Sequence, residues 1–184
     1  MSNPEKKIAS SKISEAAKAH PTEGLGEAIW SILETVTDPE VPVLTVTDLG
    51  IIRKVNINGD AVEVVITPTY TGCPAMDMIA ANIRMELLAH GFSNIKITSV
   101  LSPAWTTDWM SEAGKEKLRA YGIAPPNPRQ QVCNNELFAP HEVVQCPHCN
   151  SYHTHRISEF GSTACKSLYQ CDDCKEPFDY FKCH

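Results

Sequence analysis

The C-terminal part of the chain carries two Cys-x-x-Cys pairs, and no other feature limits its fold as strongly. The pairs are Cys146/Cys149 and Cys171/Cys174, with 21 residues between them. A Cys-x-x-Cys turn can direct both sulfurs to one ion at about 2.3 Å, and two such turns complete a tetrahedral shell with no open position. The spacing therefore predicts a structural zinc site. Iron in the same four-sulfur cage stays open as an alternative.

The sequence around these cysteines predicts a small β ribbon. Residues 152–157 and 167–170 have the character of short strands, and few large apolar side chains are available to form a core. Such a module could hardly fold without its metal, because bound zinc contributes on the order of 10–16 kcal/mol. Three cysteines are left over. Cys133 has no expected role, and Cys165 and Cys183 are expected to be ordinary thiols, although either could replace a pair member or meet a transient metal.

The other side chains of the ribbon argue against a nucleic-acid partner. Acidic residues outnumber basic residues between positions 141 and 184, and a phosphate-binding surface needs the opposite balance. Because four cysteines already complete the shell, we expect the nearby histidines to lie at the surface: His148, His153, His155 and His184. A structural or protein-contact role is expected instead, through three aromatic residues: Phe178, Tyr180 and Phe181.

The expected cellular compartment bears on the role of the cysteines. The chain has 184 residues, eight of them cysteines, and a formal net charge of −6. It has no apolar run long enough for a membrane helix, and its N-terminus lacks the apolar core of a signal peptide. We therefore expect a cytoplasmic protein with no membrane association. Disulfides rarely persist in that compartment, which favours metal binding or redox chemistry for the cysteines.

A further cysteine, Cys73, lies in the stretch Thr67–Asp77 between an expected strand and an expected helix. Residues 61–67 alternate as in a strand, and apolar residues recur at helical spacing from Met76 until Gly91. Pro74 suits the first helical position, which predicts Cys73 as the cap residue, where the helix dipole would stabilise a thiolate. The alternative is that Cys73 is a small buried apolar side chain.

The remaining patterns predict an α+β fold. A helix is expected over 22–36, a strand over 51–57 in a hairpin with 61–67, and a third strand over 95–101. A short helix is expected to end at about Tyr121 and to be capped by Thr107, Asp108 or Ser111. These elements form a small mixed β-sheet covered by helices, followed by the ribbon. We expect Trp105 and Trp109 to pack in the core and in a lid over it. The expected regions are a mobile tail (1–21), the α+β domain (22–124), a Pro-rich linker (125–142) and the zinc ribbon (143–184).

Several motifs resemble a known family. The segments Asp38-Pro39-Glu40-Val41-Pro42, Asp48-Leu49-Gly50 and Thr67–Pro74 are similar to the MIP18 (DUF59) family of iron–sulfur assembly domains, over residues 24–124. Three further segments narrow the resemblance to the D subunits of bacterial phenylacetyl-CoA epoxidase systems: Trp105–Ser111, Gly122–Pro126, and the ribbon motifs Phe160–Thr163 and Glu176–Tyr180.

This resemblance implies an accessory protein, without catalysis of its own, that helps mature the metal centres of a multicomponent oxygenase. Its partners would be the reductase component, with a flavin and a [2Fe–2S] cluster, and the diiron component. The resemblance implies Cys73 as the ligand of a transient iron or iron–sulfur cluster, with Thr69, Asp38 and Glu40 beside it. Clusters usually take four cysteine ligands, so a second copy of Cys73 in a homodimer, or a client protein, would complete the site.

Two other functions stay open from the sequence. A structural subunit of the oxygenase would dock through the ribbon, and Cys73 would only pack. An enzyme with a Cys73 nucleophile would need a neighbouring histidine base. The only histidine between Gly24 and Pro125 is His90, about a helix length from Cys73.

Overall fold

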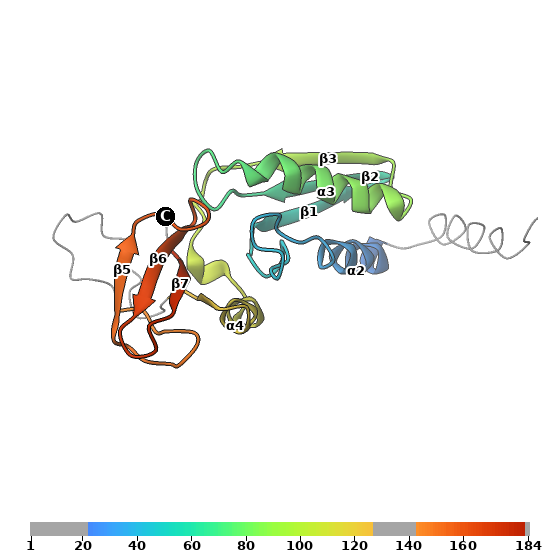
Figure 1. The fold of residues 1–184 in the computed structure, drawn as a ribbon. Helices are drawn as coiled ribbons and strands as arrows, with labels where there is room; N and C mark the ends of the chain where they lie inside the picture. The colour runs from blue at the N-terminus through green and yellow to red at the C-terminus, as the bar shows by residue number, and fades with distance from the viewer. Residues whose placement is uncertain (1–21, 127–142, 183–184) are drawn as a thin grey trace, which may run out of the picture.

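The computed structural model describes residues 22–126 and 143–182, and it consists of helices around two small β-sheets (Figure 1). The predicted α+β class is confirmed. The expected tail (1–21) and most of the expected linker lie outside the described residues. The elements that build the first sheet and its cover are, in order, α2 (Thr22–Leu33), β1 (Ile52–Asn58), β2 (Ala61–Ile66), α3 (Ala75–Ala89) and β3 (Asn94–Ser99).

The first sheet is mixed and has the order β1-β2-β3. Strands β1 and β2 form an antiparallel hairpin, in which Gly59 adopts a φ of +62° that favours glycine. Strand β3 runs parallel to β2, and α3 makes the crossover between them. Parallel neighbours need such a crossover, so the observed order follows from a hairpin, a helix and a returning strand. The predicted mixed sheet is confirmed.

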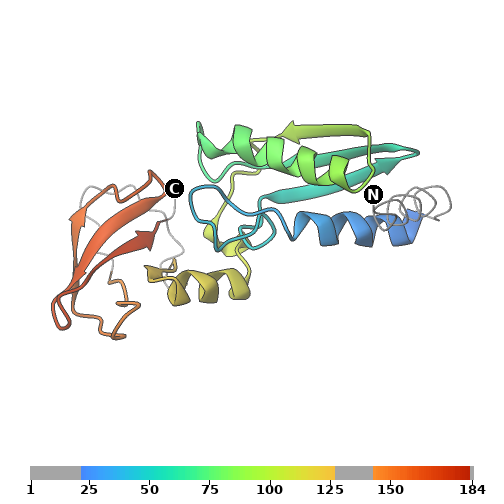
Figure 2. The same ribbon diagram turned by 45° about the vertical axis from the view of Figure 1, so that its right-hand side comes forward.

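Two helices pack on one face of this sheet. Helix α2 contacts both α3 and β1, and α3 contacts β3 (Figure 2). Alternate residues of β2 are buried on this face (Val62, Val64 and Ile66), as are residues of α3 at helical spacing (Ile79, Ile83 and Leu87). The residue between two of the buried valines, Glu63, instead accepts hydrogen bonds from Asn56 and Thr98. One fully buried face and one partly exposed face explain the alternating burial along the strand.

In the segment after the first sheet, one of the three predicted caps, Ser111, begins the helix, and a separate short turn that was not predicted precedes it. A short 3-10 helix, η2 (Thr107–Trp109), is followed by α4 (Glu112–Ala120), whose N-cap Ser111 accepts a hydrogen bond from the Gly114 amide. The break occurs because the Ser111 side chain supplies a new cap. Trp105 is 3% exposed and donates its indole N–H to the Leu49 carbonyl, which confirms its predicted place in the core.

The second sheet has the order β4-β7-β6-β5, with bounds Ile123–Ala124, Pro177–Phe181, Lys166–Cys171 and Thr154–Ser158. Strand β4 precedes the stretch that the structure leaves undescribed, yet it pairs in parallel with β7 near the C-terminus. The ribbon sheet therefore includes two residues from the end of the expected first domain. The division of the chain near residue 124 stays a prediction.

The aromatic residues of β7 are buried, which agrees with the structural alternative of their predicted role and not with contact to another protein. Phe178 stacks on Tyr169 and belongs with Tyr180 to the ribbon's own core. Phe181 packs edge-on against Trp105 in the core of the first sheet, with 6.3 Å between the ring centroids. Strand β7 lies between β4 and β6 in the sheet. Its aromatic side chains therefore fill the ribbon core and the contact between the two sheets.

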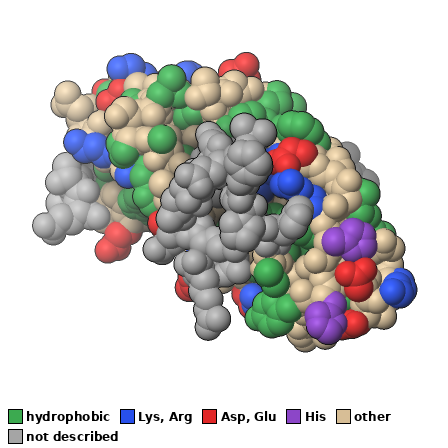
Figure 3. Space-filling model, turned by 90° about the vertical axis from the view of Figure 1, so that its left-hand side faces the viewer, with side chains coloured by type: hydrophobic (Ala, Val, Ile, Leu, Met, Phe, Trp, Pro, Cys, Tyr) green, Lys and Arg blue, Asp and Glu red, His purple; other side chains and the backbone are tan. Residues whose placement is uncertain are grey.

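The histidines of the described ribbon are exposed, as predicted. His153 and His155 pair with Asp173 and Asp172 respectively. Histidine side chains lie beside acidic side chains on the face in Figure 3. His184 lies outside the described residues. None of the helices in the described ranges has the length and apolar character needed to cross a membrane.

Candidate metal centres

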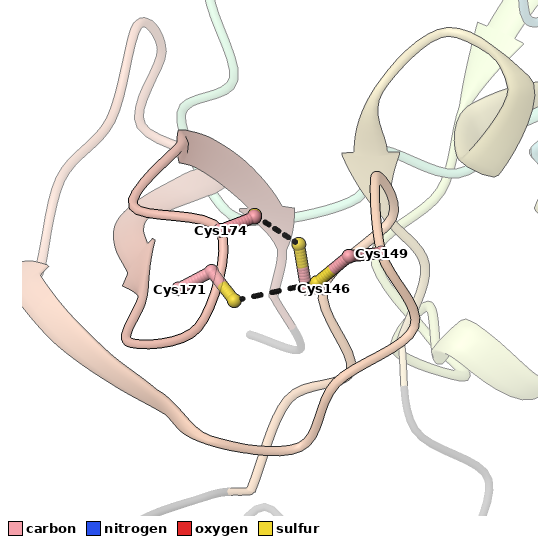
Figure 4. A group of neighbouring side chains, drawn as sticks. All are labelled: Cys146, Cys149, Cys171 and Cys174. Atoms are coloured by element: carbon pink, nitrogen blue, oxygen red, sulfur yellow. Dashed lines mark hydrogen bonds between the residues drawn. The ribbon is translucent and has the colours of Figure 1, made fainter.

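The four cysteines of the two Cys-x-x-Cys pairs meet at one end of the ribbon (Figure 4). Their sulfur atoms all lie within 4.8 Å of one another. The Cys146 and Cys174 sulfurs are 3.7 Å apart, and those of Cys149 and Cys171 are 3.5 Å apart. A tetrahedral ion about 2.3 Å from each sulfur would separate the sulfurs by about 3.8 Å. The donor set therefore fits one metal ion held by four thiolates.

Two similar turns direct these sulfurs inward. After the second cysteine of each pair, one residue adopts a left-handed conformation, Asn150 with φ 62° and Lys175 with φ 66°. The amide of Asn150 donates to the Cys146 carbonyl, and the amide of Lys175 donates to the Cys171 carbonyl. Because the chain reverses its direction within five residues in each turn, both sulfurs of a pair point toward the same candidate metal position.

Backbone amides also act on the sulfur atoms. The N–H groups of Cys174 and Asp173 lower the pKa of Cys171 to about 7. In the other pair burial raises the pKa of Cys146, against the effect of the N–H groups of Cys149 and His148. Such hydrogen bonds stabilise thiolates, the form in which cysteine binds metals.

The turn that contains Asp38 orients Glu40. The Oδ1 atom of Asp38 accepts hydrogen bonds from the amides of Glu40 and Val41, at 2.7 and 2.8 Å. Asp38 is buried, whereas Glu40 is partly exposed. The carboxylate of Asp38 is thus engaged in holding the turn. The carboxylate of Glu40 points toward Cys165.

The Cys73 loop differs in one detail from its prediction. The N-cap of α3 is Pro74, with helical φ −69° and ψ −22° and no side-chain hydrogen bond, so the prediction of Cys73 as the cap is wrong by one residue. The Cys73 carbonyl accepts from the Met76 amide at 3.3 Å, and the Cys73 amide donates to the Tyr70 carbonyl at 3.2 Å. Cys73 is partly buried against the first core.

Tyr70 and Cys165 join this region, and sequence reasoning assigned neither of them to it. The Cys165 sulfur lies 3.7 Å from the Oε2 atom of Glu40. A side-chain hydrogen bond links Tyr70 to Cys73. Burial raises the pKa of Tyr70 to about 12, and the charges of Cys73, Glu40 and Cys165 act in the same direction. We call Glu40, Tyr70, Cys73 and Cys165 the Tyr70 cluster.

Two other groups near the loop contribute less. Thr69 is partly exposed, and its side chain makes no hydrogen bond to another described residue. Thr67, at the end of β2, is 1% exposed, and its hydroxyl oxygen has no hydrogen-bond partner among the described residues. His90 is the C-cap residue of α3, where its ring contacts the Glu86 carbonyl. It lies at the opposite end of the helix from Cys73, and the structure gives no Cys/His pair there.

Known families match both parts of the chain. The family described as iron-sulfur cluster assembly protein matches residues 26–92, and the PaaD zinc beta ribbon domain matches residues 130–182. A protein of Escherichia coli (strain K12), provisionally named among the D subunits of 1,2-phenylacetyl-CoA epoxidase, is 52% identical over 155 residues, which cover 84% of this chain and 91% of that protein. The chain belongs to the same family.

The assembly domain of this chain also has separate relatives. A protein of Porphyromonas gingivalis named Fe-S protein maturation auxiliary factor is 42% identical over 94 residues, 50% of this chain and 89% of that protein. A crystal structure of a DUF59 domain from Bacillus anthracis is 25% identical and covers 52% of this chain and 92% of its own, with a TM-score of 0.48. The two family matches confirm the resemblance to a MIP18 (DUF59) domain with a zinc ribbon.

Proposed function

We propose that this protein is a non-catalytic accessory factor that helps assemble an iron–sulfur or diiron centre in a component of a phenylacetyl-CoA epoxidase. One observation carries the proposal: the domain with Cys73 is related to a maturation factor, and most of the chain is related to a component of the epoxidase. An accessory role in iron–sulfur assembly, with protein partners, is supported by both relatives. The clients would be the reductase and diiron components.

The ribbon would hold a structural zinc ion through Cys146, Cys149, Cys171 and Cys174. Four thiolates close the shell, so such an ion has no open position for a substrate and contributes folding energy instead. The ribbon's own core consists of a few residues around Tyr169 and the cysteines, and this small size supports a dependence on metal.

Cys73 would be the iron-facing thiol. Glu40 would lie beside it as a carboxylate donor, and Asp38 would hold Glu40 in position. Thr69 would line the path by which iron reaches Cys73. The short contacts of Asp38 with the turn and the clustering of Glu40, Tyr70 and Cys73 support this division of roles. Iron or a cluster is cargo in this proposal, and it passes to the client.

Anaerobic reconstitution with ferrous iron and sulfide tests the proposal. The zinc-loaded protein should develop sulfur-to-iron charge-transfer absorption. This absorption should vanish in Cys73→Ala and survive in Cys133→Ala and Cys183→Ala, which remove other thiols. Equal absorption in Cys73→Ala and the unchanged protein would contradict the role of Cys73.

A second function, a permanent structural subunit of the epoxidase, is favoured by one observation. The ribbon exposes Tyr152, Ile157 and Phe160 at 58%, 50% and 62%, which suits a docking face. Pull-down experiments with the epoxidase components separate the two functions. A maturation factor should bind the iron-free client preferentially and be absent from the active enzyme, whereas a permanent component should co-purify at fixed stoichiometry and be required for the rate.

A further inference from the structure

Cys165 lies in the ribbon sequence but packs in the core of the first sheet. It follows the loop after β5 and immediately precedes β6. Its side chain is 7% exposed and belongs to the core that contains Trp105 and Phe181, not to the core around Tyr169. Its carbonyl accepts from the Lys182 amide at 3.1 Å, which ties it to the end of β7. The ribbon therefore inserts this thiol into the other domain.

Within this apolar core, the Cys165 sulfur also has two polar contacts. The Thr163 hydroxyl lies 3.0 Å from it, and the Oε2 atom of Glu40 lies 3.7 Å from it. A cysteine that served only as apolar filler would not need such contacts. Cys165 instead faces the carboxylate of Glu40. The turn at Asp38 holds the Glu40 amide, and the Glu40 side chain extends toward Cys165.

Tyr70 connects this thiol to Cys73. Tyr70 and Cys73 both pack against the core that contains Cys165. The charges of Cys73, Glu40 and Cys165 add to the effect of burial, which raises the pKa of Tyr70. The Tyr70 cluster thus brings together two thiols and one carboxylate from three segments far apart in the chain. These are soft and anionic donors, which suit a thiophilic cation such as iron.

Resting on the function proposed above, we propose that Cys165 is a second thiolate ligand for the iron cargo, so that the ribbon completes the Cys73 site within one chain. Each thiol releases one proton to water as its sulfur–iron bond forms, and the iron keeps its oxidation state. A second copy of Cys73 is then not needed to supply the second sulfur.

The Tyr70 cluster is not a closed metal shell. Among the described residues, only the four ribbon cysteines form a group of ligand atoms that all lie within 4.8 Å of one another. At least one pair among Cys73, Cys165 and Glu40 is therefore farther apart, and further ligands would have to complete the coordination of the cargo.

The test uses the full zinc-loaded chain reconstituted anaerobically with ferrous iron and sulfide. Cys165→Ala should lose its cluster to a chelator about tenfold faster than the unchanged protein, or more. Cys165→Ser should shift the absorption and the EPR spectrum of the reduced cluster, because oxygen replaces one sulfur. A merely structural role of Cys165 would not produce that shift.

Three control variants separate ligation from packing. Cys133→Ala and Cys183→Ala remove other thiols and should behave as the unchanged protein. Thr163→Val removes the hydroxyl next to the Cys165 sulfur but keeps the thiol, so it should retain the cluster and its spectrum. Zinc content and urea unfolding show whether each variant is folded, and if Cys165→Ala is not, the spectrum of Cys165→Ser decides.

The results distinguish this inference from the proposed function. If Cys73→Ala loses the cluster while both Cys165 variants match the unchanged protein in loss rate and spectrum, Cys165 is not a ligand and the proposed function stands. If Cys73→Ala keeps the full absorption, the proposed function and this inference both fail.

Discussion

The ribbon cysteines come from two short turns, whereas the Tyr70 cluster is drawn from three segments that are far apart in the chain. In the ribbon, each Cys-x-x-Cys turn fixes two sulfurs through its own backbone, and the shell is closed. In the Tyr70 cluster, each thiol depends on a different part of the fold. A closed shell retains its ion, while an open one suits cargo that must leave again.

Removal of the ribbon metal should have the largest effect of any change. Chelation, or Cys171→Ser, should unfold the ribbon, because structural zinc contributes on the order of 10–16 kcal/mol. Amide hydrogen exchange should show loss of protection in β5, β6 and β7, while β1 to β3 stay protected. Cys133→Ser is the matched control. If the amides of the ribbon stayed fully protected without metal, the ribbon site would not be structural. Its contrast with the open Tyr70 cluster would then fail.

Loss of the Phe181 ring should have the next largest effect. Phe181 is 2% exposed and packs against Trp105, so Phe181→Ala should lower the free energy of unfolding by about 3–5 kcal/mol. Urea unfolding of the zinc-loaded protein measures this change. Phe160→Ala, at a ring that is 62% exposed, should cost less than about 1 kcal/mol. Equal losses would show that the two sheets are not coupled through Phe181.

The Asp48 network offers a third test, because it stabilises the first domain without any thiol. Burial raises the pKa of Asp48, but hydrogen bonds from Lys117, Thr45 and Ser111 outweigh this effect, and the net pKa lies below the ordinary 3.8. The carboxylate therefore adds stability above the unfolded-state pKa, and this stability is lost as the pH falls through the lower folded-state pKa.

Asp48→Asn should lower the free energy of unfolding at pH 7 by about 1–3 kcal/mol. It should also make the acid loss of stability below about pH 4 shallower. Denaturant unfolding at a series of pH values measures both effects. Asp60→Asn in the exposed hairpin is the control. An unchanged acid limb in Asp48→Asn would show that this carboxylate is not linked to folding.

Glu40→Gln should have the smallest effect on stability, within about 0.5 kcal/mol, because Glu40 is partly exposed and its amide keeps its bond to Asp38. Iron retention should nevertheless fall about tenfold. Asp38→Ala is the contrasting variant. It removes the acceptor of two backbone amides and should cost about 1–3 kcal/mol. A stability loss in Glu40→Gln as large as in Asp38→Ala would identify Glu40 as a structural residue.

Much of the fold could be predicted from local patterns. The β1–β2 hairpin followed from alternation and Asn58-Gly59, and α3 followed from its apolar spacing. Ser111 was among the predicted caps of α4, but the separate 3-10 helix at Thr107–Trp109 was not predicted, because a single turn has no apolar period of its own. Strand β4 was missed because it has only two residues and its partner, β7, is far away along the chain.

The sequence by itself determined that the four ribbon cysteines converge, because a turn of four residues controls where two sulfurs point. It also predicted Cys73 as a site residue, because motif resemblance covers the Cys73 loop. Only the tertiary structure decided that Cys165 and Tyr70 lie beside Glu40, and that Asp38 serves the turn. Contacts between such distant segments depend on how the two sheets pack around Trp105 and Phe181. No local pattern in the chain encodes that packing.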